Sequence, residues 1–531
     1  MKTSNSKAKA FAFWGAAFVL LAAVFTGCKQ SAGGSGSGIG GGAPEAPFVE
    51  GGASLILSPD KLDIKVKVTT SDGSAVAVEG CTETTLLSGT ETVLQAKGTV
   101  VILKGKIIEL DCSGTFSDNN QLTALNVQGL TALQVLECNY NRLTALNVQG
   151  CAALQVLSCG INQLTAIDVQ GLSALQRLYC NWNPLTALDV QGLNNLQELG
   201  CVGNQLTSLN VQGLNNLQWL NCRWNQLTAL NVWGCTALQT LDCWENQLTA
   251  LNVQGCTALQ TLICCINQLT TLDVQGLSTL QELNCNHNRL AVLNVWGCTA
   301  LQKLECQENQ LTALNVQGCT ALKGLNCSRN QLTALDVQGL NNLQWLYCDN
   351  NQLTALNVQG LSALRRLSCC GNQLTALNVQ GLSNLQWLDC DNNQLTALNV
   401  QGLSALRRLS CCGNQLTALN VQGLNALQNL GFGNNQLTAL NVQGLSALRY
   451  LTCWSNQLNA EAFIKIFNDL PTWTESDNAC CSLYTEQTGV TEGNYTDFTT
   501  PSEVQAAFQN AKDVKKWKMY KYNGNWPGEK I

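Results

Sequence analysis

The chain has 531 residues, of which only 12% are charged, and it contains 45 glycines, 28 cysteines and a single histidine, His287. Such a bias is typical of a repeat protein rather than of several unrelated globular domains. A single histidine argues against an ordinary hydrolase or zinc enzyme, because histidine is the commonest general base and metal ligand. The net charge of −6, with no basic run beyond the first 27 residues, argues against a nucleic-acid partner.

Residues 1–27 have the order of a signal peptide, because a lysine-bearing start leads into an apolar run over residues 11–25 that is too short to span a membrane. The run ends in Phe-Thr-Gly before Cys28, which resembles a relaxed lipoprotein cleavage site, so Cys28 is predicted to be acylated. An ordinary signal peptide or a short membrane anchor is the alternative. Residues 28–51 are rich in glycine and serine and predict a flexible tether. We therefore expect an exported protein, anchored by lipid to the outer membrane at the cell surface.

A 21-residue repeat begins at Leu122 and recurs to Leu458, which gives sixteen coils. Its general form is LxxLxCxxNxLxxLxVxGxxx, and around the central LxC the side chains alternate inward and outward, as in a strand. Stacked coils then form one parallel sheet with strands about 4.8 Å apart and a total length near 77 Å. The repeat therefore predicts a β-rich solenoid.

Three positions of the repeat are invariant. Asn recurs from Asn120 to Asn456, and an inward Asn must hydrogen-bond to neighbouring backbone. Val127 and its equivalents are predicted to line the opposite wall of the core, and Gly129 and its equivalents the returning turn.

This unit contains the leucine-rich-repeat signature LxxLxLxxNxL with Cys in place of the third Leu, so residues 116–458 are identified as a leucine-rich-repeat solenoid. The 21-residue cysteine variant resembles the repeats of internalin J and of short-repeat surface proteins of Treponema. The resemblance implies a bacterial surface lipoprotein whose parallel sheet lines the concave face, and an asparagine ladder that is structural rather than catalytic.

Both open ends of a solenoid core must be covered. Residues 52–115 alternate in strand fashion and predict a β-rich N-terminal cap, in which Leu110-Asp111-Cys112 forms a first coil with an insertion before Asn120. Residues 459–531 predict a C-terminal cap that contains α-helix. Its helices are expected from Ala460 to Leu470 and from a Thr500–Glu503 capping box to about Trp517.

Fifteen cysteines occupy one column of the repeat, from Cys138 to Cys453, interrupted only by Phe432. Five more alternate with Leu at another inward position, namely Cys151, Cys235, Cys256, Cys298 and Cys319. Such replacements indicate apolar sites of moderate size. Because column neighbours have parallel Cβ vectors, we predict a reduced, buried cysteine ladder, with scattered disulfides or bound metal as alternatives. Cys265, Cys370 and Cys412 follow a ladder cysteine by one residue and are predicted to be exposed.

Residue identity varies mainly at four outward positions on and just after the strand, and these positions carry aromatic and arginine side chains. The predicted partner-binding residues are Tyr179, Trp182, Trp219, Arg223, Trp224, Trp244, Trp345, Tyr347, Arg366, Trp387, Arg408, Tyr450 and Trp454. Trp, Tyr and Arg dominate the energetics of protein interfaces. The structural alternative is that Trp345, Arg366, Trp387 and Arg408 only stack on one another as an alternating column.

The leading hypothesis is a non-catalytic, adhesin-like surface protein that recognises a host or bacterial protein through the concave face. No catalytic, metal or cofactor site is predicted, because the repeats offer no acid, base or nucleophile constellation. The alternatives are glycan binding on the tryptophans, and a structural protein that self-associates through solenoid edges or exposed thiols.

Overall fold

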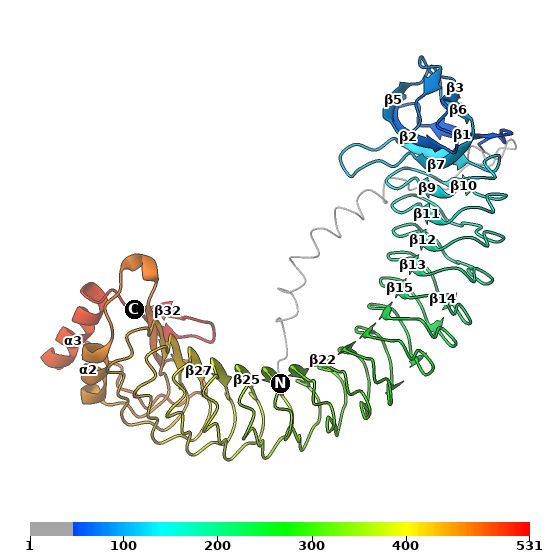
Figure 1. Ribbon diagram of the computed structural model, residues 1–531. Coiled ribbons are helices and arrows are strands. Elements are labelled where there is room, and N and C mark those ends of the chain that lie inside the picture. The colour runs from blue at the N-terminus through cyan, green and yellow to red at the C-terminus, as the bar shows by residue number, and fades with distance from the viewer. Residues whose placement is uncertain (1–45) are drawn as a thin grey trace, which may run out of the picture. The chain divides into compact units, whose positions relative to one another are not determined.

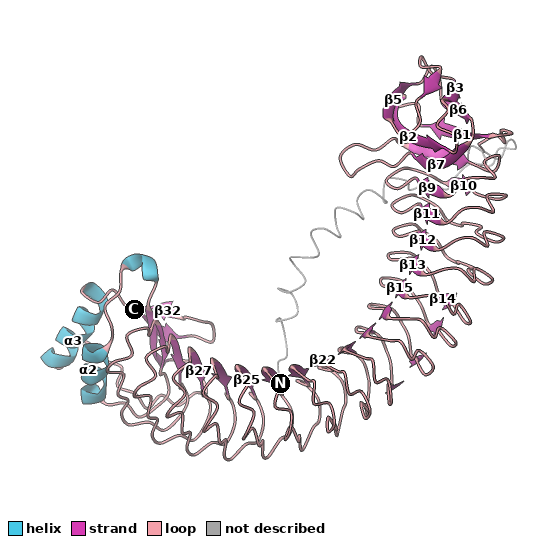
Figure 2. Ribbon diagram, in the orientation of Figure 1, coloured by secondary structure: helices cyan, strands magenta, loops and turns pink. Residues whose placement is uncertain are grey.

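The computed structural model describes residues 46–531, which belong to one compact unit. The predicted signal peptide, Cys28 and nearly all of the tether lie outside the described residues. The unit is a curved solenoid with a β-rich N-terminal cap (Figure 1), and helix is confined to its C-terminal cap (Figure 2). Within residues 46–531, neither helix combines the length and hydrophobicity needed to cross a bilayer.

Each coil contributes one three-residue strand to the inner side of the curve (Figure 1). These strands are β9 (Val135–Glu137), β11 (Val156–Ser158), β12 (Arg177–Tyr179), β13 (Glu198–Gly200), β15 (Trp219–Asn221), β17 (Thr240–Asp242), β19 (Thr261–Ile263), β21 (Glu282–Asn284), β22 (Lys303–Glu305), β23 (Gly324–Asn326), β24 (Trp345–Tyr347), β25 (Arg366–Ser368), β26 (Trp387–Asp389), β27 (Arg408–Ser410), β28 (Asn429–Gly431) and β29 (Tyr450–Thr452). The sixteen predicted coils are therefore confirmed.

Neighbouring inner strands pair in parallel and in strict register, with Leu136 opposite Leu157 and Leu157 opposite Leu178. Register is fixed because each coil has 21 residues, and a slip by one residue would turn the buried leucine toward solvent. Some coils carry a second short strand on another wall, namely β10 (Ala145–Asn147), β14 (Ser208–Asn210), β16 (Ala229–Asn231), β18 (Ala250–Asn252) and β20 (Thr271–Asp273).

The N-terminal cap is built from strands, as predicted. They are β1 (Gly52–Leu57), β2 (Asp63–Thr70), β3 (Val76–Glu79), β4 (Thr85–Leu86), β5 (Glu91–Gln95), β6 (Val100–Lys104) and β7 (Ile107–Asp111). Strand β8 (Leu122–Asn126) opens the repeat and pairs in parallel with β10 of the next coil. Strand β7 pairs in parallel with β9 and places Leu110 opposite Leu136, which confirms the predicted first coil. Strand β2 then pairs antiparallel with β7, and β1 antiparallel with β8, so that the cap closes the solenoid end.

The C-terminal cap contains α2 (Ala460–Asp469), the 3₁₀ turn η1 (Glu475–Asp477), β30 (Cys480–Thr485), α3 (Ser502–Asp513), β31 (Lys518–Tyr522) and β32 (Glu529–Lys530). The predicted capping box is wrong, because α3 has Pro501 as its N-cap and Thr500 donates its hydroxyl to Asp497 instead. The helix also ends at Asp513, four residues before the predicted end.

The cap also extends the solenoid, which the sequence period did not predict. Strand β30 pairs in parallel with β29, and β31 with β30. Asn494 continues the asparagine ladder, because its Oδ1 accepts the Leu458 N–H at 3.0 Å and its Nδ2 donates to the Cys453 carbonyl at 2.8 Å. Helix α2 is inserted between Asn456 and Asn494, and this insertion hides the rung in the sequence.

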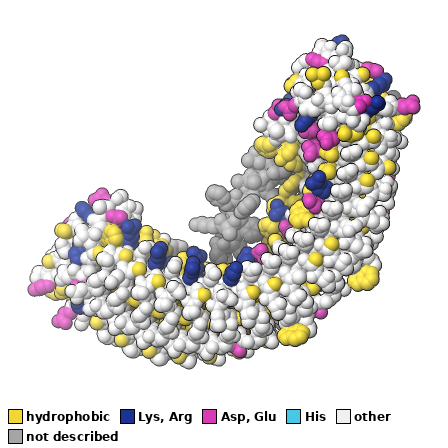
Figure 3. Space-filling model, viewed as in Figure 1, with side chains coloured by type: hydrophobic (Ala, Val, Ile, Leu, Met, Phe, Trp, Pro, Cys, Tyr) yellow, Lys and Arg dark blue, Asp and Glu magenta, His cyan; other side chains and the backbone are white. Residues whose placement is uncertain are grey.

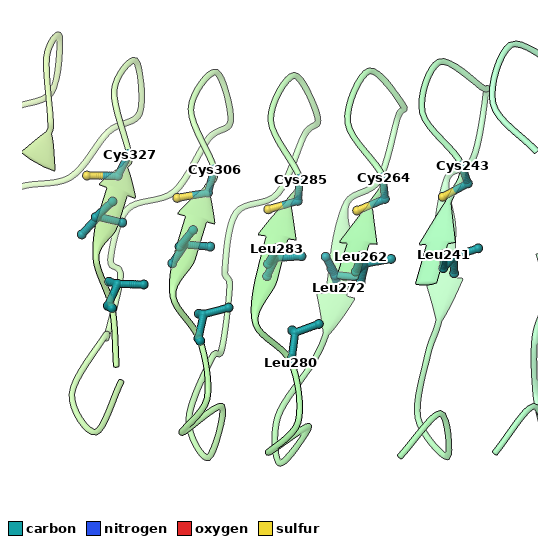
Figure 4. Close-up of a cluster of buried hydrophobic side chains, with 14 of the residues drawn as sticks. Leu241, Cys243, Leu262, Cys264, Leu272, Leu280, Leu283, Cys285, Cys306 and Cys327 are labelled. Atoms are coloured by element: carbon teal, nitrogen blue, oxygen red, sulfur yellow. The ribbon is translucent and has the colours of Figure 1, made fainter. Parts of the chain in front are cut away.

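The core consists of columns of identical buried side chains. In Figure 4 the ladder cysteines Cys243 to Cys327 lie in one row with their sulfur atoms pointing the same way. All 27 described cysteines are free thiols, and the cysteine ladder is confirmed. Several thiols also donate weak hydrogen bonds, such as Cys348 Sγ to the Ser368 carbonyl of the next coil at 3.4 Å. Cysteines of the second column donate to the preceding coil instead, as Cys235 Sγ does to the Val211 carbonyl at 3.1 Å.

The asparagine ladder ties adjacent coils together. Asn309 Oδ1 accepts the Leu290 N–H at 2.9 Å, and its Nδ2 donates to the carbonyls of Cys285 at 3.0 Å and Cys306 at 3.1 Å. The same pattern recurs in the neighbouring coils, so the predicted structural role of the ladder is confirmed. Gly150 and its equivalents through Gly444 have φ between 77° and 89°, a region in which an L side chain is strained, so the repeat keeps glycine at this turn.

Candidate binding surface

The inner face is formed by four columns of side chains that the inner strands hold in place. The first and third residues of each strand point away from the core, whereas the middle leucine is buried. The first residue after each strand is the ladder position, and the second and third residues after the strand complete the inner face. Each column repeats once per coil, so its members lie about 4.8 Å apart. Every predicted partner-binding residue lies in one of these columns.

The third residue after each strand has a left-handed backbone in every coil. The non-glycine residues in this column, such as Ile161 and Asn350, have φ between 51° and 56°. This conformation costs roughly 1 to 2 kcal/mol for an ordinary residue and least for Gly and Asn. Coils eleven to fifteen satisfy the preference, because they carry Asn350, Gly371, Asn392, Gly413 and Asn434.

The first ten coils instead carry mostly large side chains in this column, with Gly203 as the exception between the two tryptophans. The large residues are Tyr140, Ile161, Trp182, Trp224, Glu245, Ile266, His287, Glu308 and Arg329. The N-terminal coils therefore keep bulky groups on the inner face at a cost in backbone strain. Strain of this kind is concentrated at functional sites in proteins.

Trp182, Trp224 and Trp244, with Arg223, form a continuous group that we term the tryptophan cluster. The ring centroids of Trp182 and Trp224 are 5.2 Å apart, and those of Trp224 and Trp244 are 5.5 Å apart. The Arg223 guanidinium lies 4.6 Å from the Trp224 ring centre. Gly203 makes this arrangement feasible, since a Cβ there would lie 2.5 Å from the Trp182 ring. The sequence prediction that these residues gather on one face is consistent with this geometry.

A shallow hollow of about 410 Å³ lies beside the cluster. Its lining includes Tyr140, Ile161, Trp182, Trp219 and Arg223. Buried N–H groups of the cluster are left without an acceptor among the described residues, namely Arg223 Nε and Trp244 Nε1. Leaving a buried donor unsatisfied costs about 1 to 3 kcal/mol, so the cluster is not arranged for maximal stability.

Tyr179 and Trp219 form a neighbouring pair on strands β12 and β15. Their rings meet edge to face with centroids 6.4 Å apart, and the Tyr179 hydroxyl donates to the Glu198 carboxylate. Burial, followed by the hydrogen bond to Glu198, raises the pKa of Tyr179 to about 12, so the hydroxyl stays a donor at neutral pH. The pair borders the hollow through Trp219.

Tyr140 and Ile161 line the same hollow and were not among the predicted binding residues. Tyr140 and Ile161 share the strained column with Trp182, and periodicity alone could have identified them. Phe116 is 86% exposed on the loop between β7 and β8, which Lys61 holds through an ion pair to Asp118 at 2.7 Å. Because this loop interrupts the 21-residue period, the repeat pattern gave no signal for Phe116.

The second predicted aromatic group, in coils eleven to fourteen, does not form one alternating column. The Trp387 ring lies between Arg366, at 5.7 Å, and Arg408, at 4.7 Å. Trp345 instead stacks on Tyr347 at 5.5 Å and leans over Gly324, where a Cβ would lie 1.8 Å from the indole. The expected stack of four side chains is therefore wrong at Trp345. Gly324 in the preceding coil has no side chain, so the indole ring can lie directly over its backbone.

Tyr450 and Trp454 pack against the C-terminal cap. The Trp454 ring stacks on Tyr522 with centroids 4.5 Å apart, and Tyr450 meets Trp526 at 6.2 Å. Both side chains therefore help to seat the end of the chain, and the surface that we propose below does not include them.

The three predicted exposed thiols need correction. Cys265 is only 6% exposed, and Cys370 and Cys412 are half-buried. Members of one column lie only about 4.8 Å apart, so the adjacent coils limit the exposure of an outward side chain. Burial raises the pKa of Cys265 and Cys370 to about 12, so neither is a reactive thiolate at neutral pH.

Several charged groups of the inner face form ion pairs, as Lys303 does with Glu282 at 3.0 Å. The single histidine, His287, places Nδ1 2.9 Å from the Glu308 carboxylate on the surface. Among residues 46–531, no three His, Cys, Asp or Glu side chains gather as metal ligands.

Solved structures place this geometry in a known fold. The functional domain of InlJ from Listeria monocytogenes, which includes a cysteine ladder, matches with a TM-score of 0.53 and 27% identity over 74% of this chain and 78% of that one. YopM from Yersinia enterocolitica matches with a TM-score of 0.54 and 22% identity over 73% of this chain and 83% of that one. The chain has the leucine-rich-repeat fold.

A plant leucine-rich-repeat receptor also matches. The peptide hormone receptor RGFR1, in complex with RGF2, has a TM-score of 0.53 and 20% identity over 68% of each chain. No protein-family model and no curated protein sequence matches the chain. The resemblance to Treponema lipoproteins stays a prediction, because these structures test only the repeat.

The strained column of this leucine-rich-repeat solenoid gives a stability prediction. Ile266→Gly removes a β-branched side chain at φ 53° and should raise the free energy of unfolding by about 1 kcal/mol. Val292→Gly is the matched control, since Val292 is an exposed, branched residue outside the positive-φ set. There glycine should lower the free energy of unfolding by roughly 0.5 to 1 kcal/mol. Urea denaturation checks both values, and equal losses in the two variants would contradict the strain assignment.

Proposed function

We propose that this protein is a non-catalytic, adhesin-like binding protein whose inner face recognises a protein partner through the tryptophan cluster. The observation that carries the proposal is the placement of Trp182 and Trp224 at left-handed positions, where coils eleven to fifteen have Asn or Gly. A purely structural column would be expected to use the unstrained residues throughout.

The chemistry of the cluster supports a protein partner. Trp, Tyr and Arg are enriched at hot spots, and an aromatic anchor flanked by a shallow hollow offers a site for an apolar side chain. The unsatisfied N–H groups of Arg223 and Trp244 supply donors that a small side-chain rotation would present to an acceptor on the partner. RGFR1, which has a similar fold, forms a complex with RGF2. A peptide partner is therefore compatible with this fold.

The proposal includes export and acylation at Cys28, on the basis of the leader sequence. The intact mass of protein from the membrane fraction should then show an acylated Cys28 at the amino terminus, and Cys28→Ala should lose both the added mass and the membrane partition. An unchanged mass and partition in the variant would contradict the lipid anchor.

The proposal is tested by comparing what two matched variants capture. Mature protein, a Trp182→Ala/Trp224→Ala variant and a Trp233→Gln/Trp296→Gln variant are immobilised and exposed to the same host and bacterial protein extracts. Trp233 and Trp296 are 59% and 61% exposed on the outer turn, where most coils have Gln. Their replacement therefore controls for nonspecific binding by exposed tryptophans.

We expect the inner-face variant to bind the specific partner about thirtyfold more weakly, because losing one hot-spot anchor costs about 2 kcal/mol. The outer-turn variant should keep the affinity of the unmodified protein. Binding that survives the inner-face change but not the outer-turn change would overturn the proposal. Retention of glycans rather than proteins in a parallel array would also overturn it.

A further inference from the structure

Coils twelve and fourteen carry a repeated basic motif, in which one arginine directly precedes the inner strand and the next occupies the first, inner-face position of that strand. Residues 361–381 and 403–423 are identical in sequence, and each segment supplies one pair of adjacent arginines, Arg365–Arg366 and Arg407–Arg408. We term these the arginine pairs. Figure 3 shows Lys and Arg side chains gathered along the inner rim in this half of the solenoid.

Most of this positive charge is not balanced locally. Arg408 pairs with Asp389, with Nε 3.0 Å from the carboxylate. Arg365, Arg366 and Arg407 make no ion pair with any of the residues that the structure describes. All three are exposed, so they are available to an anionic partner.

The nearby carboxylates are committed to the solenoid itself. Asp391 accepts the Ser410 hydroxyl at 2.7 Å and the Cys412 N–H at 2.6 Å, and Asp349 accepts the Cys370 N–H at 2.8 Å. These hydrogen bonds stabilise the turn after the strand, and neither carboxylate forms an ion pair with the arginine pairs.

Trp387 contacts one arginine of each pair. Its ring lies between the Arg366 and Arg408 guanidinium groups, so both can stack on the indole. Arg408 Nε is hydrogen-bonded to Asp389, whereas the Arg366 guanidinium has no ion-pair partner among the described residues. A planar guanidinium binds a carboxylate through two parallel hydrogen bonds, and prior orientation lowers the entropy lost on binding. The geometry therefore favours carboxylates over neutral groups.

The spacing of the pairs selects a backbone conformation. The pairs are two coils apart, about 9.6 Å along the sheet. A polyproline II helix repeats every three residues and about 9.3 Å, so every third side chain faces the same way. In an extended strand the third residue faces the opposite side. An α-helix returns to one face after about 5.4 Å and, over two turns, about 10.8 Å, so the polyproline II repeat fits the spacing best.

We propose that coils eleven to fourteen form a subsite for an acidic peptide segment in polyproline II conformation, with a carboxylate at every third residue. This proposal depends on the proposed function in one respect, namely that a protein partner lies on the inner face. It does not involve the tryptophan cluster, which lies several coils away. Charge complementarity and the matching period identify the occupant.

The test uses the mature protein and two synthetic peptides of about twelve residues with the same composition. One contains repeated Glu-Pro-Pro triplets, and the other has its glutamates in one block and its prolines in another. Calorimetric titration should give at least tenfold tighter binding for the triplet peptide. Equal affinity for the two peptides would overturn the proposal, because it would mean that only total charge matters.

Two variants locate the subsite. Arg365→Gln with Arg407→Gln should weaken triplet-peptide binding by roughly tenfold or more. Arg449→Gln is the matched control, because Arg449 occupies the same column but pairs with Asp477 at 3.4 Å. Removal of residues 385–426 takes out two whole coils and leaves a single arginine pair, and this variant should bind like the double substitution.

The cooperative melting transition of each variant is verified before titration, and the double substitution keeps the proposal falsifiable if the deletion fails to fold. A weaker response to the double substitution than to Arg449→Gln would overturn the assignment. Binding of heparin fragments without binding of the triplet peptide would also overturn it and assign the surface to sulfated glycans. Because capture on the tryptophan cluster is measured separately, failure here leaves the proposed function standing.

Discussion

Raising the pH from about 8 to about 10 in the presence of a reductant should lower the melting temperature of this protein steeply. Burial raises the pKa of Cys180 and Cys327 to about 12, and that of the fully buried Cys159 well above the ordinary value. In the unfolded chain a thiol has a pKa near 8.5. Because the folded-state pKa is the higher one, the stabilisation is fully present below about pH 8.5 and is lost as the pH rises toward the folded-state values.

Each such thiol removes about 1.4 kcal/mol of stability per pH unit over that range. Five thiols would therefore remove about 7 kcal/mol within one unit, comparable with the entire stability of a typical domain. Circular-dichroism melts between about pH 7 and pH 10 measure the loss. A thiol count on the denatured, unreduced protein should first show that most cysteines are free.

A matched variant isolates the thiols from other alkaline effects. Replacing the five second-column cysteines by Leu introduces the residue that other coils carry there, as at Leu172 and Leu340. Burial raises the pKa of Cys151 and Cys256 to about 11, so these thiols contribute to the same loss. The variant should retain more of its neutral-pH stability at about pH 10. Melting temperatures that do not change with pH in either protein would contradict a buried, protonated ladder.

Removal of one asparagine rung should destabilise the solenoid strongly. Asn309→Ala leaves the buried Leu290 N–H without an acceptor. It also removes one of the two amide donors to each of the Cys285 and Cys306 carbonyls, which keep their bonds to Asn288 and Asn330. An unsatisfied buried donor costs about 1 to 3 kcal/mol and each lost hydrogen bond about 0.5 to 1.5 kcal/mol, so we expect a loss of about 2 to 5 kcal/mol in the free energy of unfolding. The urea midpoint should fall accordingly at an unchanged denaturant slope.

Asn315→Ala provides the control within the same coil. Asn315 is exposed and its side chain accepts only the Gln317 N–H, at 3.0 Å, in a local turn. Its loss should cost no more than about 1 kcal/mol. Similar effects of the two substitutions would mean that the ladder bonds contribute no more than a surface turn.

Strict periodicity explains why so much of the fold could be predicted. Positions such as Asn309, Val316 and Cys306 recur every 21 residues, and each recurrence reports the same inward environment. The parallel sheet, the ladders and the number of coils follow from that repetition. Asn494 escaped detection because an inserted helix breaks the period that identifies the other rungs.

The sequence could predict which column each residue of the candidate site occupies, but not how the side chains are oriented within the columns. The sequence places Trp345 and Arg366 in one column, but the free space over Gly324 decides that the Trp345 ring turns away from Arg366. Similarly, burial of Cys265 depends on the side chains of adjacent coils. The left-handed backbone at Trp182 cannot be recognised from the sequence of its own coil. The Asn and Gly residues that indicate such a backbone occur in this column only in other coils.

The central claim is that a protein partner occupies the inner face at the tryptophan cluster, and hydroxyl-radical footprinting of the complex tests it most directly. Oxidation of each tryptophan is measured by mass spectrometry with and without the captured partner. Oxidation of Trp182 and Trp224 should fall on binding, while that of Trp233 and Trp296 on the outer turns should stay unchanged. Protection of Trp233 and Trp296, with Trp182 and Trp224 oxidised as in the free protein, would contradict it.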